Sequence, residues 1–158
     1  MKIRPLISVL ILILAVLIIA GSCATTKKAI SEEDFFETWS GTWADTEYSG
    51  TYNRLLKRIN HSNGTWEWYY DITGTIPNAK GISTILDHWI DSKGDIWYKA
   101  YWESTSGSEF VVVPNGYEMG KISNSGNTWE LIFTLGDSPI EEWNPDDIRY
   151  TYRIYYRQ

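Results

Sequence analysis

Cysteine, histidine and basic side chains are all scarce in this chain of 158 residues. The single cysteine excludes an intramolecular disulfide and any zinc site built from several cysteines. Two histidines leave little room for a histidine-rich metal site. Lys and Arg number 14 against 20 Asp and Glu, so the chain lacks the basic surface typical of nucleic-acid-binding proteins. We therefore expect one domain, or at most two small ones, with no metal, no cofactor and no nucleic-acid partner.

Known catalytic motifs are also absent from the sequence. There is no Gly-X-Ser-X-Gly, no phosphate loop, no His-Glu-X-X-His and no dinucleotide fingerprint. The adjacent acids Glu141-Glu142 and Asp146-Asp147 have the residue types for acid–base catalysis. In a loop that contains proline, however, such acids are more often solvated charges and helix caps. We expect a protein that is not an enzyme.

The N-terminus has the pattern of a secretory signal peptide. Lys2 and Arg4 are followed by the 15-residue stretch Leu6–Ala20, in which only Ser8 is not apolar. A permanent transmembrane helix is the alternative, but it needs about 20 apolar residues. The shorter run and its small-residue exit favour a signal peptide over residues 1–22.

The stretch Ala20-Gly21-Ser22-Cys23 contains the only cysteine and resembles the lipobox of bacterial lipoproteins. The resemblance implies cleavage before Cys23, acylation of that residue (palmitate among the acyl chains), and membrane attachment through it. Several acyl chains give stable anchoring, whereas one chain binds only marginally. By resemblance to the enterobacterial sorting rule, Ala24 favours the outer membrane, facing the periplasm or the exterior. Residues 23–30 are then the lipidated cysteine and a short tether.

A short helix is expected directly after the tether. Ser31 can cap it, acids occupy its first turn, and Asp34 follows the cap by three residues. Phe35 and Trp39 are four residues apart, so both can lie on one face.

The rest of the chain alternates β-branched and aromatic runs with short turn sequences, which predicts strands. Connections this short exclude βαβ crossovers, so the sheet is expected to be antiparallel. Closure would remove the sheet edges and bury one aromatic face. We predict an all-β fold over residues 31–158, an up-and-down meander closed into a barrel of eight to ten strands. The predicted strands are Gly41–Ala44, Tyr52–Ile59, Thr65–Ile72, Ile82–Ile90, Ile96–Ser104, Glu109–Val113, Tyr117–Ser123, Thr128–Leu135 and Ile148–Tyr156.

Gly41-Thr42-Trp43, at the start of the first strand, resembles the Gly-X-Trp signature of lipocalins and the wider calycin barrels. The resemblance implies that Trp43 packs at the closed barrel end, beneath an arginine of the last strand. Arg157 is the first candidate for that arginine and Arg153 the second. Avidins also begin with Gly-Thr-Trp, but the Ala44-Asp45-Thr46 that follows does not match their biotin-binding residues.

Ten aromatic residues alternate onto a face that we expect to point inward. They line either a ligand site or a filled core, because an eight-stranded barrel can hold one small ligand or be filled by side chains. We favour a site for a small hydrophobic ligand that involves Trp68, Trp102 and Tyr152. The alternative is a structural or protein-interaction envelope lipoprotein with a filled barrel. The inward set comprises Trp66, Trp68, Tyr70, Tyr98, Trp102, Trp129, Phe133, Tyr150, Tyr152 and Tyr156.

His88 is the one histidine placed within a predicted strand, where it shares a face with Leu86 and Ile90. It is either a haem or metal ligand in the barrel or a hydrogen-bonded histidine at the rim. The second interpretation is favoured, because His61 lies in a turn and no second ligand is visible.

Overall fold

The computed structural model describes residues 27–46, 56–107 and 115–158. The predicted signal peptide, Cys23 and the expected strand Glu109–Val113 lie outside the described residues. Within those residues, no helix combines the length and the hydropathy that crossing a membrane requires.

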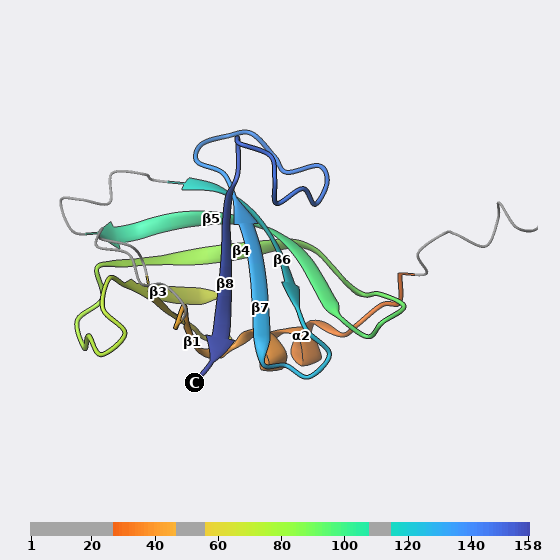
Figure 1. Cartoon of the computed structure of the whole chain (residues 1–158), viewed down its shortest axis with the longest axis horizontal. Helices are drawn as coiled ribbons and strands as arrows, with labels where there is room; N and C mark the ends of the chain where they lie inside the picture. The colour runs from red at the N-terminus through yellow and green to blue at the C-terminus, as the bar shows by residue number, and fades with distance from the viewer. Residues whose placement is uncertain (1–26, 47–55, 108–114) are drawn as a thin grey trace, which may run out of the picture.

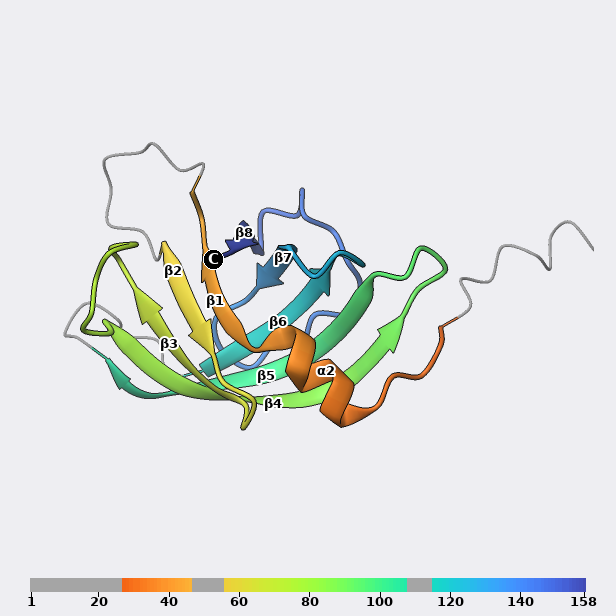
Figure 2. The ribbon, with the colours of Figure 1, turned by 90° about the horizontal axis from the view of Figure 1, so that it is seen from below.

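The predicted helix forms over Glu32–Trp39 and is labelled α2. Ser31 caps it as expected, because its Oγ accepts a hydrogen bond of 3.1 Å from the backbone N–H of Asp34. Phe35 and Trp39 are both fully buried. Figure 2 shows α2 lying across the end of the barrel at which the first strand begins.

Eight antiparallel strands form a closed barrel in which every strand pairs with its neighbours in sequence (Figure 1). The barrel closes where Trp43 and Ala44 of the first strand pair with Arg157 and Tyr156 of the last. The predicted fold class is thus confirmed. The strands are β1 (Gly41–Ala44), β2 (Lys57–Asn60), β3 (Thr65–Tyr69), β4 (Ala79–Ile90), β5 (Ile96–Gly107), β6 (Asn115–Ile122), β7 (Thr128–Phe133) and β8 (Thr151–Arg157).

The last strand begins three residues later than predicted. Asp147 and Tyr150 form a turn, closed by a 3.0 Å hydrogen bond from the N–H of Tyr150 to the carbonyl of Asp147. Ile148, the expected first strand residue, is 99% exposed. Ile148 therefore lies in the loop before β8, and its side chain is not part of the sheet.

The β8 residues that face the interior are not those predicted. Trp129 of β7 belongs to the buried interior cluster and is opposite Tyr155 in the register. Directly opposite residues share a face of the sheet, so Tyr155 points inward and is 1% exposed. Tyr152 is opposite Ile132 and lies on the other face. The prediction that Tyr150, Tyr152 and Tyr156 point inward is therefore wrong.

Ile132 and Tyr152 belong to a second apolar layer on the outer surface of the sheet. The loop between β7 and β8 folds over this surface, where Trp143 packs edge-on against Trp97 and Tyr152. Ile140 of the same loop is 4% exposed. The outer face of β8 is apolar because this loop covers it.

Candidate functional site

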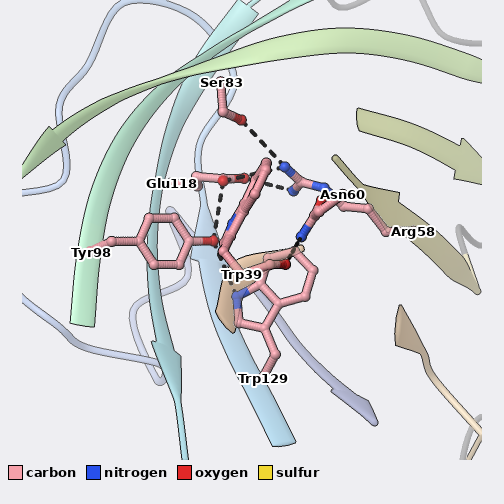
Figure 3. Close-up of polar contacts among 7 residues, drawn as sticks. All are labelled: Trp39, Arg58, Asn60, Ser83, Tyr98, Glu118 and Trp129. Atoms are coloured by element: carbon pink, nitrogen blue, oxygen red, sulfur yellow. Dashed lines mark hydrogen bonds and ion pairs between the residues drawn. The ribbon is translucent and has the colours of Figure 1, made fainter. Parts of the chain in front are cut away.

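The centre of the barrel holds an ion pair between Arg58 of β2 and Glu118 of β6 (Figure 3). Arg58 Nη1 donates to Glu118 Oε2 at 2.8 Å, and Nη2 donates to Oε1 at 3.4 Å and to the hydroxyl of Ser83 at 3.3 Å. Both charged side chains are 1% exposed. A pair this deeply buried must compensate its own charges, since water does not reach it.

Four indole rings surround the Arg58 guanidinium. Its Cζ lies 4.9 Å from the ring centroid of Trp129 and 5.2 to 5.6 Å from those of Trp39, Trp66 and Trp68. These distances fall within the range of cation–π attraction. Arg58 therefore joins the helix-covered end of the interior to the tryptophans of β3.

Tyr98 extends the polar network on the side of Glu118. Its hydroxyl donates to Glu118 Oε1 at 3.1 Å and accepts from Trp129 Nε1 at 3.1 Å (Figure 3). Burial, reinforced by the charge of Glu118, raises the pKa of Tyr98 well above its ordinary value. The phenol therefore stays neutral and remains a donor to the carboxylate.

Trp66, Trp68 and Trp102 form a cluster beside this network, which we call the tryptophan triad. Their ring centroids are 5.2 to 6.3 Å apart, and Phe133 packs against Trp68 at 5.9 Å. The side chains are 2%, 6% and 4% exposed. None of the three indole N–H groups has a hydrogen-bond partner among the described residues. The predicted ligand residues Trp68 and Trp102 thus lie together with Trp66 in the interior, whereas the third predicted residue, Tyr152, lies on the outer face of the sheet.

Two glycines fix the rings of Trp66 and Trp102 against the barrel wall. A Cβ added to Gly81 would lie 2.2 Å from the Trp66 ring, and one added to Gly116 would lie 2.6 Å from the Trp102 ring. Each glycine is directly opposite its tryptophan in the strand register. The absence of these side chains lets both indoles lie close to the wall.

At the helix-covered end, Trp43 and Arg157 pack together as the sequence predicts. Trp43 is fully buried, and the Arg157 guanidinium lies 4.4 Å from its ring centroid. Arg157 also donates to the carbonyls of Thr38 and Ser40, which end helix α2. Gly41 has φ of +123°, and a Cβ there would lie 3.0 Å from Arg157 Nη1. Gly41 therefore provides both the backbone conformation and the space that this contact needs.

Tyr152 makes a different set of contacts on the outer surface. Its hydroxyl donates to Glu130 Oε2 at 2.9 Å. Burial beneath the covering loop, together with this hydrogen bond, raises the pKa of Tyr152 above its ordinary value. These contacts give Tyr152 a role in packing the loop and not in lining the interior.

His88 and Asp147, two of the other candidate residues, each have a hydrogen-bond partner. His88 Nε2 is hydrogen-bonded at 3.1 Å to the carbonyl of Ile30 in the tether, and its ring lies 5.2 Å from Phe35. Asp147 pairs with Arg149, whose hydrogen bonds lower the pKa of the carboxyl to about 2. In the described part of the chain, no group of three His, Cys, Asp or Glu side chains could hold a metal ion.

An open groove on the outside of the barrel lies beside α2. Glutamate carboxylates and small polar groups line it, but the predicted ligand residues do not. We therefore place the candidate site inside the barrel. The groove is lined by Glu32, Glu33, Phe36, Glu37, Ser40, Ser62 and Asn63.

Arg58 and Glu118, the strongest polar pair of the interior, are not predicted from the sequence. Each of them is followed by an apolar residue, Ile59 or Met119, which is the more obvious candidate for the inward face. The strand register could have identified Arg58, because Arg58 is directly opposite Trp68, a residue that is expected to point inward.

Comparison of the chain with protein-family models, with curated proteins and with solved structures gives no match. Functional inference therefore depends on the site geometry and on the sequence motifs.

Proposed function

We propose that this chain is a bacterial lipoprotein whose lipocalin-like barrel binds a small hydrophobic molecule near the membrane, without catalysis. The tryptophan triad is the observation that carries the binding proposal. It combines three large apolar rings on the inner wall with three buried indole donors that lack partners. A buried donor without a partner costs about 1–3 kcal/mol, which a bound molecule can recover.

The lipocalin-like assignment is supported by the barrel end. The eight-stranded meander, the preceding helix, and the packing of Arg157 over Trp43 occur in the arrangement that the resemblance implies. Gly41 completes the signature, since its backbone conformation and lack of a side chain allow Arg157 to approach.

The contacts of the tether support a location close to the membrane. Lys28 and Ile90 exchange two backbone hydrogen bonds of 2.8 and 2.9 Å, which attach the tether to the end of β4. Between Cys23 and Lys28 the chain can span at most about 18 Å. Acyl chains on Cys23 would therefore hold this end of β4 near the bilayer surface of the cell envelope.

Mutation of Cys23 tests the anchor. The Cys23→Ala variant should accumulate as uncleaved precursor without lipid, whereas Ser22→Ala keeps a small residue in the motif and should be processed. Intact-mass measurement and membrane fractionation report both outcomes. A wild-type protein with unmodified Cys23 would contradict the lipoprotein proposal.

Ligand binding is tested with a fatty acid, an isoprenoid and a planar aromatic compound. Binding should quench tryptophan fluorescence saturably at about one site per chain and raise stability by about 2.7 kcal/mol at a ligand concentration of 100 Kd. Trp68→Phe or Trp102→Phe should change the affinity. The matched outer-face substitutions Tyr69→Phe and Tyr101→Phe should not.

A second candidate function is a structural or protein-interaction role for a filled barrel. The observation in its favour is the Arg58–Glu118 pair, which occupies the interior among four indole rings. If no apolar compound produces quenching or a thermal shift, this second function is the better one. Its partner should then be sought through the outer surface in envelope complexes.

A further inference from the structure

The tryptophan triad places three buried indole N–H donors without partners in one cluster of the interior. The ring centroids of Trp66, Trp68 and Trp102 lie within 6.3 Å of one another, and the nitrogen of each ring is buried. Ala79 and Phe133 pack against the rings. Among the described residues, one buried side-chain acceptor lacks a partner, Oδ1 of Asn60, which is directly opposite Trp66. The Nε of Arg58, next to the triad, is also buried and unpaired, which adds a fourth donor.

Water matches such a set of donors poorly. A buried water molecule usually makes about three hydrogen bonds and must donate as well as accept. Beside the triad, three unpaired indole donors stand against one unpaired acceptor, Asn60 Oδ1, so a water molecule could pair at most one of its hydrogens with it. An oxygen that only accepts, such as a carbonyl or carboxylate oxygen, satisfies the indoles without bringing unpaired hydrogens.

The charge balance separates these two kinds of acceptor. Glu118 contacts both terminal nitrogens of Arg58, at 2.8 and 3.4 Å, so the charge of the guanidinium is already compensated. A ligand carboxylate would enter an apolar environment beside the carboxylate of Glu118, and the guanidinium next to the triad, that of Arg58, is already paired. Burying an uncompensated anion is far more costly than burying a neutral acceptor.

We propose that the tryptophan triad binds a neutral apolar molecule through a ketone-type carbonyl oxygen, held by the indole N–H groups of Trp66, Trp68 and Trp102. This inference rests on the proposed function, because it names the ligand class of the same site. The apolar body of the ligand packs on the indole faces, and Arg58 and Glu118 remain paired.

Three probes of nearly equal size test the ligand class: 2-acetylnaphthalene, 2-ethylnaphthalene and 2-naphthoate. Their dissociation constants are measured by titration calorimetry on the full chain in lipid nanodiscs, with empty nanodiscs as the blank. The ketone should bind at least about tenfold more tightly than the hydrocarbon, since it gains one or two hydrogen bonds. It should also bind more tightly than the carboxylate.

Two tryptophan substitutions identify the donors. Trp102→Phe removes one triad N–H and should reduce the preference for ketone over hydrocarbon severalfold. Trp43→Phe is the control, because the indole of Trp43 is equally buried but donates to the carbonyl of Trp39 at 3.0 Å. Partition of each probe into lipid is the same for every variant, so it cancels when the preferences are compared. The comparison of probes on the wild-type chain does not depend on either variant folding.

Each result has a defined meaning. Equal binding of ketone and hydrocarbon, or an unchanged preference in a folded Trp102→Phe, overturns the carbonyl inference and leaves hydrophobic binding intact. Tightest binding of the carboxylate also overturns it and identifies an anion site. Absence of binding by all three probes, and by the fatty acid and the isoprenoid, overturns both the inference and the proposed function.

Discussion

The buried ion pair of Arg58 and Glu118 predicts a strong dependence of stability on Glu118. The substitution Glu118→Gln keeps the size of the side chain but leaves the Arg58 charge uncompensated in an interior where both groups are 1% exposed. Breaking a buried pair in this way costs about 3–5 kcal/mol, a large part of the total stability of an ordinary domain. Arg58→Met should have a similar cost, since it leaves the carboxylate with Tyr98 and without its cation.

The double substitution should be far less harmful than either single change. Replacing a buried pair by apolar groups is often neutral or stabilising by about 1–4 kcal/mol. Here the loss of cation–π contacts between Arg58 and four indoles offsets that gain, at about 0.5–2 kcal/mol for a favourable contact. We therefore expect Arg58→Met with Glu118→Met to lie within about 2 kcal/mol of wild type, which makes the coupling between the two positions about 4 kcal/mol or more.

Urea denaturation of the chain, followed by tryptophan fluorescence and circular dichroism, measures these free energies of unfolding. At a slope of about 2 kcal/mol per molar urea, a loss of 4 kcal/mol lowers the midpoint by about 2 M. Asp87→Asn is the matched control, because Asp87 pairs with Lys27 at 3.8 Å and both side chains are more than half exposed. It should cost less than about 1 kcal/mol. Additive effects of the two single changes would refute the reasoning.

Three further predictions follow from the packing and the titration of buried groups. Trp43→Ala should lower the free energy of unfolding by about 3–5 kcal/mol and Arg157→Ala by less, as measured in urea; the reverse order would contradict the packing described at this end. The raised pKa of Tyr98 means that the folded state binds its proton more tightly than the unfolded state does. Stability should therefore be full below about pH 10 and fall above it, at up to about 1.4 kcal/mol per pH unit for this group, and Tyr98→Phe should remove that part of the slope. Trp143→Ala should lower the thermal midpoint by loosening the outer layer but leave ligand affinity unchanged; a matching loss of affinity would place the site outside the barrel.

The sequence predicts the fold because local and global signals agree along most of the chain. The cap at Ser31, the pair of Phe35 and Trp39, and the strict alternation around Trp66 and Trp68 each specify a local structure that the barrel uses. The contact between Trp43 and Arg157 is predictable for another reason. It follows from the resemblance of Gly41-Thr42-Trp43 to the Gly-X-Trp signature, and the closure of β1 against β8 brings the two residues together.

The contents of the interior are harder to predict, because alternation identifies two faces of a strand and not which of them points inward. On β8 the face with Tyr152 and Ile154 is more apolar than the face with Arg153 and Tyr155, which favours the wrong choice. The more apolar face of a strand usually points to the interior. Here it points outward, because the loop between β7 and β8 covers the outer surface with Ile140 and Trp143.

The same loop explains why a charged pair can occupy the barrel interior. Met119 faces outward beneath Ile140, so its neighbour Glu118 must face inward. Arg58 lies opposite Trp68 and faces inward with it, and the Glu118 carboxylate compensates the charge of this guanidinium among the indoles. Apolar residues thus lie on both faces of the sheet, in the interior core and beneath the loop. The interior also holds the tryptophan triad, whose three N–H groups lack partners among the described residues. These unpaired donors, beside a charge pair that is already compensated, are the basis of the binding proposal.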